Sequence, residues 1–162
     1  MALNPILKKR LTIEANEMRD KPPENCSAGP NGSDLTKWSA TIIGPKNTPY
    51  SDGVFYLTIS FSNNYPYKAP TVSFDTPIYH PNISKNGAIC IHILKDQWSA
   101  VLTTQKVLLS ISSLLADPNP NDPLEPEIAR QFRDNKLKFD ITARQWTDKH
   151  ATGERKKADA KK

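Results

Sequence analysis

The chain has 162 residues, of which 37% are apolar and 24% charged, the composition of an ordinary globular domain. The formal net charge is +5, but residues 151–162 hold five basic and two acidic side chains, so the remaining chain is close to neutral and has no basic stripe for nucleic acid. No apolar run reaches the roughly 18 residues that span a bilayer, and no secretory signal is visible, so we expect no membrane association and reduced cysteines.

Residues 5–20 are predicted to form a helix. Pro5 suits a first helical turn, and Asn4 before it can cap the helix. Apolar side chains recur at helical spacing and predict a face turned to the core: Leu7, Leu11, Ala15 and Met18. Lys9 and Arg10 lie off that face, either in solvent or on a surface for a partner.

Residues 25–75 carry strand signals. Runs rich in β-branched and aromatic residues occupy 38–43, 54–61 and 71–74, and Gly, Pro, Asn and Asp separate them. Short turns between successive strands favour an antiparallel meander. The Tyr65–Pro66 bond is a candidate cis bond.

Cys90 stands in the middle of the most irregular stretch, residues 78–98. Between Ile89 and Ile91, a cysteine is by pattern alone most often a small buried side chain. A thiolate is also a strong nucleophile that forms acyl intermediates. The turn residues on the N-terminal side, His80-Pro81-Asn82 and Asn86-Gly87, predict a fixed loop, which favours a reactive site.

The remaining chain predicts three helices. A wide apolar stripe predicts the first at about residues 103–116, with Leu109 outside the stripe. Residues 117–124 are too rich in proline for a helix and are expected to form a stiff loop. Helices at 126–133 and 136–150 follow. We predict one domain over residues 1–150 and, because residues 151–162 are polar and unpatterned, a basic disordered tail.

The His80-Pro81-Asn82 motif followed by Cys90 resembles the active-site segment of the ubiquitin-conjugating enzymes. The resemblance continues through residues 98–115 and 117–129, covers roughly residues 5–150, and looks closest to the ligase-versatile class. It implies an α+β fold, the UBC fold: an N-terminal helix, a four-stranded antiparallel meander sheet, an active-site loop, a crossover helix and two C-terminal helices.

The resemblance also implies a reaction. Cys90 would accept the C-terminal carboxyl of ubiquitin from the activating enzyme as a thioester, then pass it to a lysine of a protein substrate with a RING or U-box ligase, or to the cysteine of a HECT ligase. The thioester already carries the activation, so no metal or cofactor is expected, and ATP is used by the upstream activating enzyme. We expect a monomer in the cytoplasm and nucleus.

Several residues receive roles from this resemblance. Asn82 would either donate to the developing oxyanion or hold the active-site loop in shape. Without the resemblance, the pattern would favour a turn residue with no part in the chemistry. Asp122 would orient the incoming ammonium and assist its deprotonation, or is simply an exposed loop aspartate. His80 and Pro81 would shape the loop.

Three partner surfaces follow from the same resemblance. The activating enzyme and the ligase would share one surface, made by Lys9, Arg10, Tyr67, Ser99, Ala100 and Val101. Leu109 would contact the thioester-linked ubiquitin, and Ser27 would lie where a second ubiquitin binds non-covalently.

Two positions depart from the versatile class. His92 replaces the usual aspartate two residues after the cysteine, and in an extended backbone it would face the same side as Cys90. We expect it to make lysine capture sensitive to pH between about 6 and 7.5, the range in which an ordinary histidine titrates. Ala100-Val101 stands where Pro-Ala is usual, which leaves the range of ligases open.

Other functions stay open at this stage. A cysteine hydrolase would pair Cys90 with His80 or His92. The chain would otherwise conjugate a different ubiquitin-like modifier, or be a non-catalytic relative that binds ubiquitin. The basic tail is either a solvated segment, a nuclear-targeting signal or a contact for an acidic partner.

Overall fold

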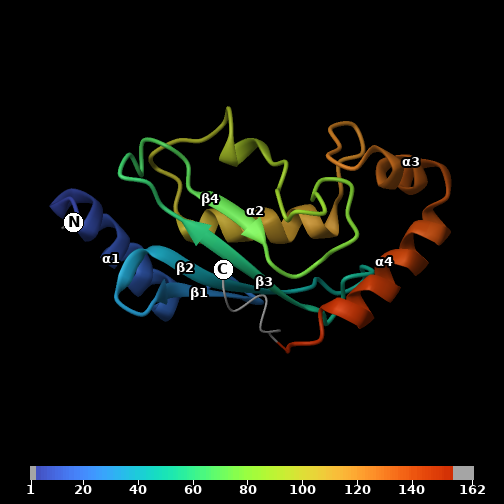
Figure 1. Cartoon of the computed structure of the whole chain (residues 1–162), viewed down its shortest axis with the longest axis horizontal. Helices are drawn as coiled ribbons and strands as arrows, with labels where there is room; N and C mark the ends of the chain where they lie inside the picture. Colours follow the sequence, from blue (N-terminus) through green and yellow to red (C-terminus); the bar gives the residue numbers. More distant parts are fainter. Residues whose placement is uncertain (1–2, 155–162) are drawn as a thin grey trace.

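The computed structural model describes residues 3–154 (Figure 1). The elements follow in the order α1 (Pro5–Asp20), β1 (Cys26–Asn31), β2 (Asp34–Ile43), β3 (Val54–Ser60), β4 (Thr71–Phe74), the short 3-10 helix η1 (His92–Leu94), α2 (Thr104–Ala116), α3 (Pro126–Asp134) and α4 (Lys136–His150). The four strands form one antiparallel sheet in the order β1-β2-β3-β4. The predicted α+β fold with a meander sheet is confirmed.

The sheet buries one face and leaves the other partly open. On the buried face, alternate residues of β2 and β3 point into the core, among them Trp38, Phe55 and Leu57. α2 runs across this face (Figure 1) and adds its apolar stripe to the same cluster: Val107, Leu108, Ile111 and Leu115. The period of two in the strands and the period near 3.6 in α2 therefore meet in one core.

The helices at the two ends of the molecule frame this sheet (Figure 1). α1 begins as predicted, with the Asn4 side chain accepting from the backbone N–H of Ile6 at 2.9 Å. α3 and α4 lie at the opposite end, and Phe139 and Ala143 of α4 are buried. The Tyr65–Pro66 bond is cis. No helix in residues 3–154 has the length and apolarity to cross a membrane.

The segment after α4 differs from the prediction in its first residues. We expected a disordered tail from Ala151 onward, but Ala151 is buried and its carbonyl accepts from the N–H of Val54 at 3.1 Å. The hydroxyl of Tyr56 donates to the carbonyl of Gly153 at 2.8 Å. These two bonds hold residues 151–153 on β3. The polar composition of the segment gives no sign of either bond. The rest of the predicted tail, residues 155–162, lies outside the described residues.

A buried carboxylate joins three parts of the fold, and the sequence pattern did not predict it. Glu14 is only 2% exposed. One of its oxygens, Oε2, accepts from Arg10 Nε at 2.7 Å and from the Tyr65 hydroxyl at 2.6 Å. The other, Oε1, accepts from the N–H and hydroxyl of Thr104 at 2.7 and 2.9 Å. Glu14 therefore connects α1, the loop after β3 and the first turn of α2.

Arg10 extends this connection to the loop before α2. Its two terminal nitrogens donate to the carbonyls of Ala100 and Leu102 at 3.0 and 2.7 Å. A planar guanidinium can serve a carboxylate and two carbonyls at once because its N–H groups point in fixed directions. Burial and the carboxylate of Glu14 both raise the pKa of Tyr65, which stays neutral as a donor.

Replacing Glu14 with alanine is expected to lower the free energy of unfolding by about 3–4 kcal/mol, because the Arg10 charge and the donors of Tyr65 and Thr104 lose their buried acceptor. Urea denaturation at pH 7 measures the loss. Glu17→Ala on the same helix is the matched control and should change stability by less than about 0.5 kcal/mol. An equal loss in both variants would contradict the role given to Glu14.

Candidate active site

Three consecutive residues, His80-Pro81-Asn82, hold the loop that carries Cys90 against the chain between α2 and α3. His80 is fully buried. Its Nδ1 accepts from the backbone N–H of Asn82 at 3.0 Å, so its Nε2 carries the proton and donates to the carbonyl of Leu114 at 2.9 Å. Burial lowers the pKa of His80 to about 4, and the ring is therefore neutral at physiological pH.

Pro81 and Asn82 make the next contacts along the same chain. The Pro81 carbonyl accepts from the backbone N–H groups of Leu124 and Glu125 at 2.9 and 3.0 Å. The Asn82 side chain is 1% exposed and makes three hydrogen bonds. Its Nδ2 donates to the carbonyls of Asn119 and Asp122 at 2.8 and 3.0 Å, and its Oδ1 accepts from the N–H of Asn119 at 2.8 Å.

These bonds separate the two roles considered for Asn82. Both N–H groups of its amide are used by backbone carbonyls, so the amide shapes the loop of residues 119–122 in this state. Donation to an oxyanion would require one of these bonds to open. The geometry therefore favours the loop-holding role, through which Asn82 fixes the position of Asp122.

Cys90 is bonded directly to Asn82 through the backbone. Its backbone N–H donates to the carbonyl of Asn82 at 2.9 Å. The turn before it needs Gly87, which has φ +87°, and a Cβ there would lie 2.0 Å from the carbonyl oxygen of Phe74. The residue is 9% exposed, at the edge of the core rather than inside it.

Two charged side chains of opposite sign flank the sulfur. Asp122 Oδ2 lies 3.5 Å from Cys90 Sγ and accepts from the thiol. Lys95 Nζ lies 3.2 Å from the same sulfur. The hydrogen bond to the sulfur raises the pKa of Lys95. The ammonium favours negative charge on the sulfur and the carboxylate opposes it.

Lys95 was not predicted, because its approach depends on a turn that the sequence reading missed. The sequence predicted a fixed loop for this stretch but not the turn that residues 92–94 form as η1. An extended strand would place Lys95 about 16 Å from Cys90, at about 3.3 Å per residue. η1 folds the chain back and brings the ammonium to the sulfur.

His92 lies on the Cys90 side of the site, as expected for extended backbone: Ile91 between them has φ −146° and ψ 133°, and η1 begins at His92. Its Nε2 is 3.7 Å from Asp122 Oδ2, and its Nδ1 is 3.1 Å from Asp96 Oδ1. The hydrogen bond to His92 lowers the pKa of Asp96. His92 therefore reaches Cys90 only through the shared Asp122 carboxylate.

This geometry does not favour a cysteine hydrolase. Within residues 3–154, the hydrogen-bond partners of the Cys90 sulfur are Asp122 and Lys95, and neither His80 nor His92 bonds to it. His80 is buried and bonded at both ring nitrogens. Within the same residues, no group of three side chains could hold a metal ion.

The residues predicted to contact the ligase and the activating enzyme lie at the α1 end. Arg10 bonds to the Ala100 carbonyl, and Trp98 donates to the Pro66 carbonyl at 2.8 Å, next to Tyr67. Tyr67 and Val101 are 83% and 82% exposed, and Lys9 and Ser99 are also exposed. The guanidinium of Arg10 is bound internally, so its polar groups are less available to a partner than predicted.

The other two predicted contacts are accessible. Leu109 is half exposed on the outer side of α2. Ser27 is exposed on β1, opposite Thr41 of β2, on the open face of the sheet. Their roles stay predictions.

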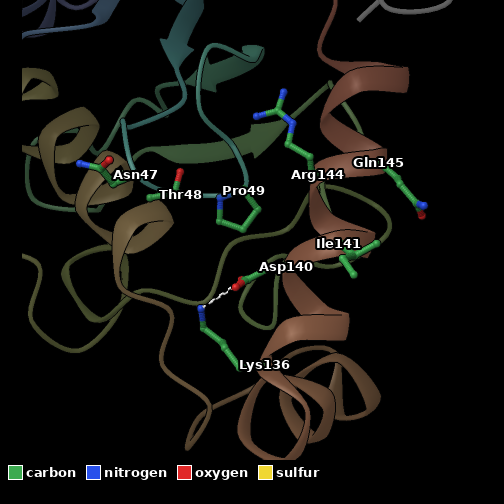
Figure 2. A pocket seen from close by; sticks show the side chains of 8 residues that line it. All are labelled: Asn47, Thr48, Pro49, Lys136, Asp140, Ile141, Arg144 and Gln145. Atoms are coloured by element: carbon green, nitrogen blue, oxygen red, sulfur yellow. Dashed lines mark hydrogen bonds and ion pairs between the residues drawn. The ribbon is translucent and has the colours of Figure 1, made fainter.

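One cavity lies away from Cys90. It has a volume of about 470 Å³ and separates the loop of residues 47–49 from α4 (Figure 2). Its charged side chains already have partners: Lys136 pairs with Asp140 at 3.0 Å, and Arg144 pairs with Asp148 at 2.6 Å. Cys90 is not among the residues that line this cavity, so the cavity is separate from the candidate site.

Comparisons with known proteins identify the family of the chain. The family model described as ubiquitin-conjugating enzyme matches residues 10–147. Among solved structures, the E2 domain of a Toxoplasma gondii ubiquitin conjugating enzyme is 41% identical, with a TM-score of 0.84 over 90% of this chain and 99% of the other.

The fold is expected to lose stability as the pH falls below 6.5. The unfolded chain protonates His80 there, whereas the folded chain does not until about pH 4, so the loss reaches about 3 kcal/mol at pH 4. NMR of the His80 ring between pH 8 and 4 tests the cause directly. Its signals should stay constant above pH 5, and a midpoint near 6.5 would contradict the buried neutral ring.

Proposed function

The chain belongs to the ubiquitin-conjugating enzyme family, and on that premise we propose that Cys90 accepts ubiquitin from the activating enzyme as a thioester and delivers it to lysines of protein substrates. Delivery runs with RING or U-box ligases, or through the cysteine of a HECT ligase. The protein acts in the cytoplasm and nucleus as a monomer and needs no cofactor of its own.

One observation carries this proposal: the thiol of Cys90 lies between an ammonium and a carboxylate, on a loop that the buried side chains of His80 and Asn82 hold in place by hydrogen bonds. Lys95 Nζ at 3.2 Å can stabilise the thiolate that attacks the incoming acyl group. Asp122 Oδ2 at 3.5 Å lies where an amine attacking a thioester on Cys90 would approach. A carboxylate there attracts an ammonium and can accept its proton.

The residues around Cys90 divide the work of acyl transfer. The Cys90 thiolate attacks the thioester on the activating enzyme, a new C–S bond forms, and the thiolate of that enzyme leaves. A substrate amine then attacks the new thioester, a C–N bond forms, the Cys90 thiolate leaves, and the proton of the amine passes to Asp122 or to solvent. Asp122 orients the amine, and Asn82 keeps Asp122 in place by bonding its carbonyl. His92, 3.7 Å from the same carboxylate, makes amine capture depend on pH when it gains a proton.

Thioester formation is tested by mixing the protein with ubiquitin, Mg-ATP and an activating enzyme. A band heavier by one ubiquitin should appear on a non-reducing gel and vanish with added thiol. Cys90→Ser should form instead an ester that resists thiol, while Cys26→Ser, which removes a buried thiol whose pKa burial raises to about 11, should leave the band unchanged.

The result that contradicts the proposal is an absent band beside a competent control enzyme. A band formed only when another ubiquitin-like protein and its own activating enzyme are supplied would assign the chain to that modifier. Binding of ubiquitin without any covalent product would make it a non-catalytic relative.

A further inference from the structure

A cavity of about 330 Å³ lies between residues 78–85, the start of α3 and α4, and the reaction proposed above does not use it. Three isoleucines give it an apolar lining: Ile78, Ile83 and Ile128. Two aromatic side chains, Tyr79 and Trp146, also line it, with ring centroids 5.5 Å apart and planes at 52°. We call this space the α3 cavity.

The two rings differ in what they leave open to a ligand. Tyr79 is held in place, because its hydroxyl donates to the side-chain oxygen of Gln131 at 2.8 Å. Trp146 is partly exposed, and its indole N–H makes no hydrogen bond within residues 3–154. No buried side-chain nitrogen of these residues is without a partner, so this N–H is accessible from solvent. A molecule in the α3 cavity can therefore meet both an aromatic face and an available donor.

Two carboxylates and one ammonium complete the lining of the α3 cavity. Glu125 Oε2 accepts from the backbone N–H of Lys85 at 3.1 Å, which leaves its Oε1 for a ligand. Glu127 pairs with Arg130 at 3.1 Å, but both side chains are largely exposed, so this pair is weak and can exchange. The exposed ammonium of Lys85 has no partner within residues 3–154 and can turn to solvent on its flexible stem. The fixed charge nearest a ligand is therefore negative.

The α3 cavity lies a short length of chain from the candidate active site. Glu125 comes three residues after Asp122, so their Cα atoms are at most about 11 Å apart. The N–H of Glu125 donates to the carbonyl of Pro81 at 3.0 Å, which ties this end of the cavity to the segment that holds Cys90. Two to four extended residues of a bound peptide, at about 3.3 Å each, cover such a distance. A protein whose lysine lies at Asp122 can thus place a neighbouring side chain in the α3 cavity.

We propose that the α3 cavity is a substrate subsite, which binds a cationic side chain, arginine in preference, of the protein whose lysine receives ubiquitin. This inference rests on the proposed function. The isoleucines cover the aliphatic stem, the rings of Tyr79 and Trp146 meet the guanidinium, and Glu125 pairs with it. Arginine suits these walls better than lysine, because its flat group stacks on aromatic faces and offers two N–H groups to one carboxylate.

Other side chains fit the α3 cavity less well. An acidic side chain would bring a further negative charge to Glu125 and Glu127. A purely apolar side chain would fill the space beside the isoleucines, but it would take water from the carboxylates and give them no donor in return. A cation with an aliphatic stem satisfies both parts of the lining.

Binding is tested first on the full chain without ubiquitin. N-acetyl-arginine amide is titrated into the ¹⁵N-labelled protein, and N-acetyl-citrulline amide, of the same shape without the charge, is the matched probe. The indole N–H signal of Trp146 should shift and saturate in the millimolar range, and citrulline should bind at least threefold more weakly. The indole signals of Trp38 and Trp98 should stay in place, because these N–H groups donate to the carbonyls of Leu35 and Pro66 at 2.8 Å each.

Three variants assign the charges. Glu125→Gln keeps an acceptor for the N–H of Lys85 but should weaken arginine binding about fivefold and remove the preference over citrulline. Lys85→Gln removes the opposing ammonium and should strengthen binding about twofold. Glu24→Gln changes an exposed glutamate between α1 and β1 and should leave both affinities as they are.

The substrate role is tested on the charged protein. After EDTA stops the activating enzyme, the thioester is discharged by peptides that carry one lysine and, two to four residues away, either arginine or citrulline. At low peptide concentration, arginine should speed discharge at least threefold for at least one spacing, through a lower KM with the maximal rate unchanged. Glu125→Gln should bring the ratio of the two peptides close to one. The ratio is taken within each variant, so differences in charging cancel.

The outcomes separate this inference from the proposed function. If Trp146 does not respond, or if citrulline binds as well as arginine, the α3 cavity is not a site for a cation, and the proposed function stands as long as the thioester forms. If arginine binds but no spacing favours the arginine peptide, the cavity is not a substrate subsite. If no thioester forms at all, the proposed function is wrong, and the substrate role of the cavity is wrong with it.

Discussion

The side-chain amide of Asn82 makes three hydrogen bonds to the backbone of residues 119 and 122, and these bonds hold the Asp122 carboxylate near the Cys90 sulfur. A proline-rich loop has few backbone donors with which to hold itself. The chain supplies the missing contacts from one short strap: the His80 ring bonds α2, the Pro81 carbonyl bonds the start of α3, and the Asn82 amide bonds the loop between them. Each group is buried, so water competes little for these bonds.

The helix α2, to which His80 is bonded, is itself held to α1 by a buried carboxylate. Glu14 joins α1 to the start of α2, and the Arg10 beside it bonds the carbonyls of the loop that the resemblance assigns to ligase recognition. Arg10 is predicted to contact a partner, and its bonds to Ala100 and Leu102 also shape the loop of this chain that the partner would bind. A substitution at Arg10 would change both at once, whereas exposed Lys9 can be changed without touching the anchor.

Much of the fold was readable from local patterns. The cap at Asn4, the apolar stripe of α2 and the runs of β-branched and aromatic residues in β2 and β3 each placed an element, because these signals depend on neighbouring residues alone. Glu14 was not found, since a single glutamate on a helix has the same pattern whether exposed or bonded to three distant groups. Lys95 was missed because the predicted irregular loop gave no sign of η1, the turn that folds the chain back after Cys90.

The resemblance drew attention to Cys90, Asn82 and Asp122, but their geometry came only from the fold. Sequence left two roles open for Asn82, and the three bonds of its amide favour the positioning one. Ala151 shows the same limit at the C-terminus: a polar segment gave no sign of the backbone bond to Val54. Contacts made by backbone groups leave little trace in residue type.

The central claim is that Asn82 acts through Asp122, and a double-mutant cycle tests it most directly. Each variant, Asn82→Ala, Asp122→Ala and the double, is charged with ubiquitin, and the rate constant for discharge is taken from its dependence on added free lysine, per thioester formed. If Asn82 positions Asp122, the double variant should be no slower than the slower single variant. If the two losses multiply instead, Asn82 acts on the reacting atoms independently of Asp122 and the account is wrong.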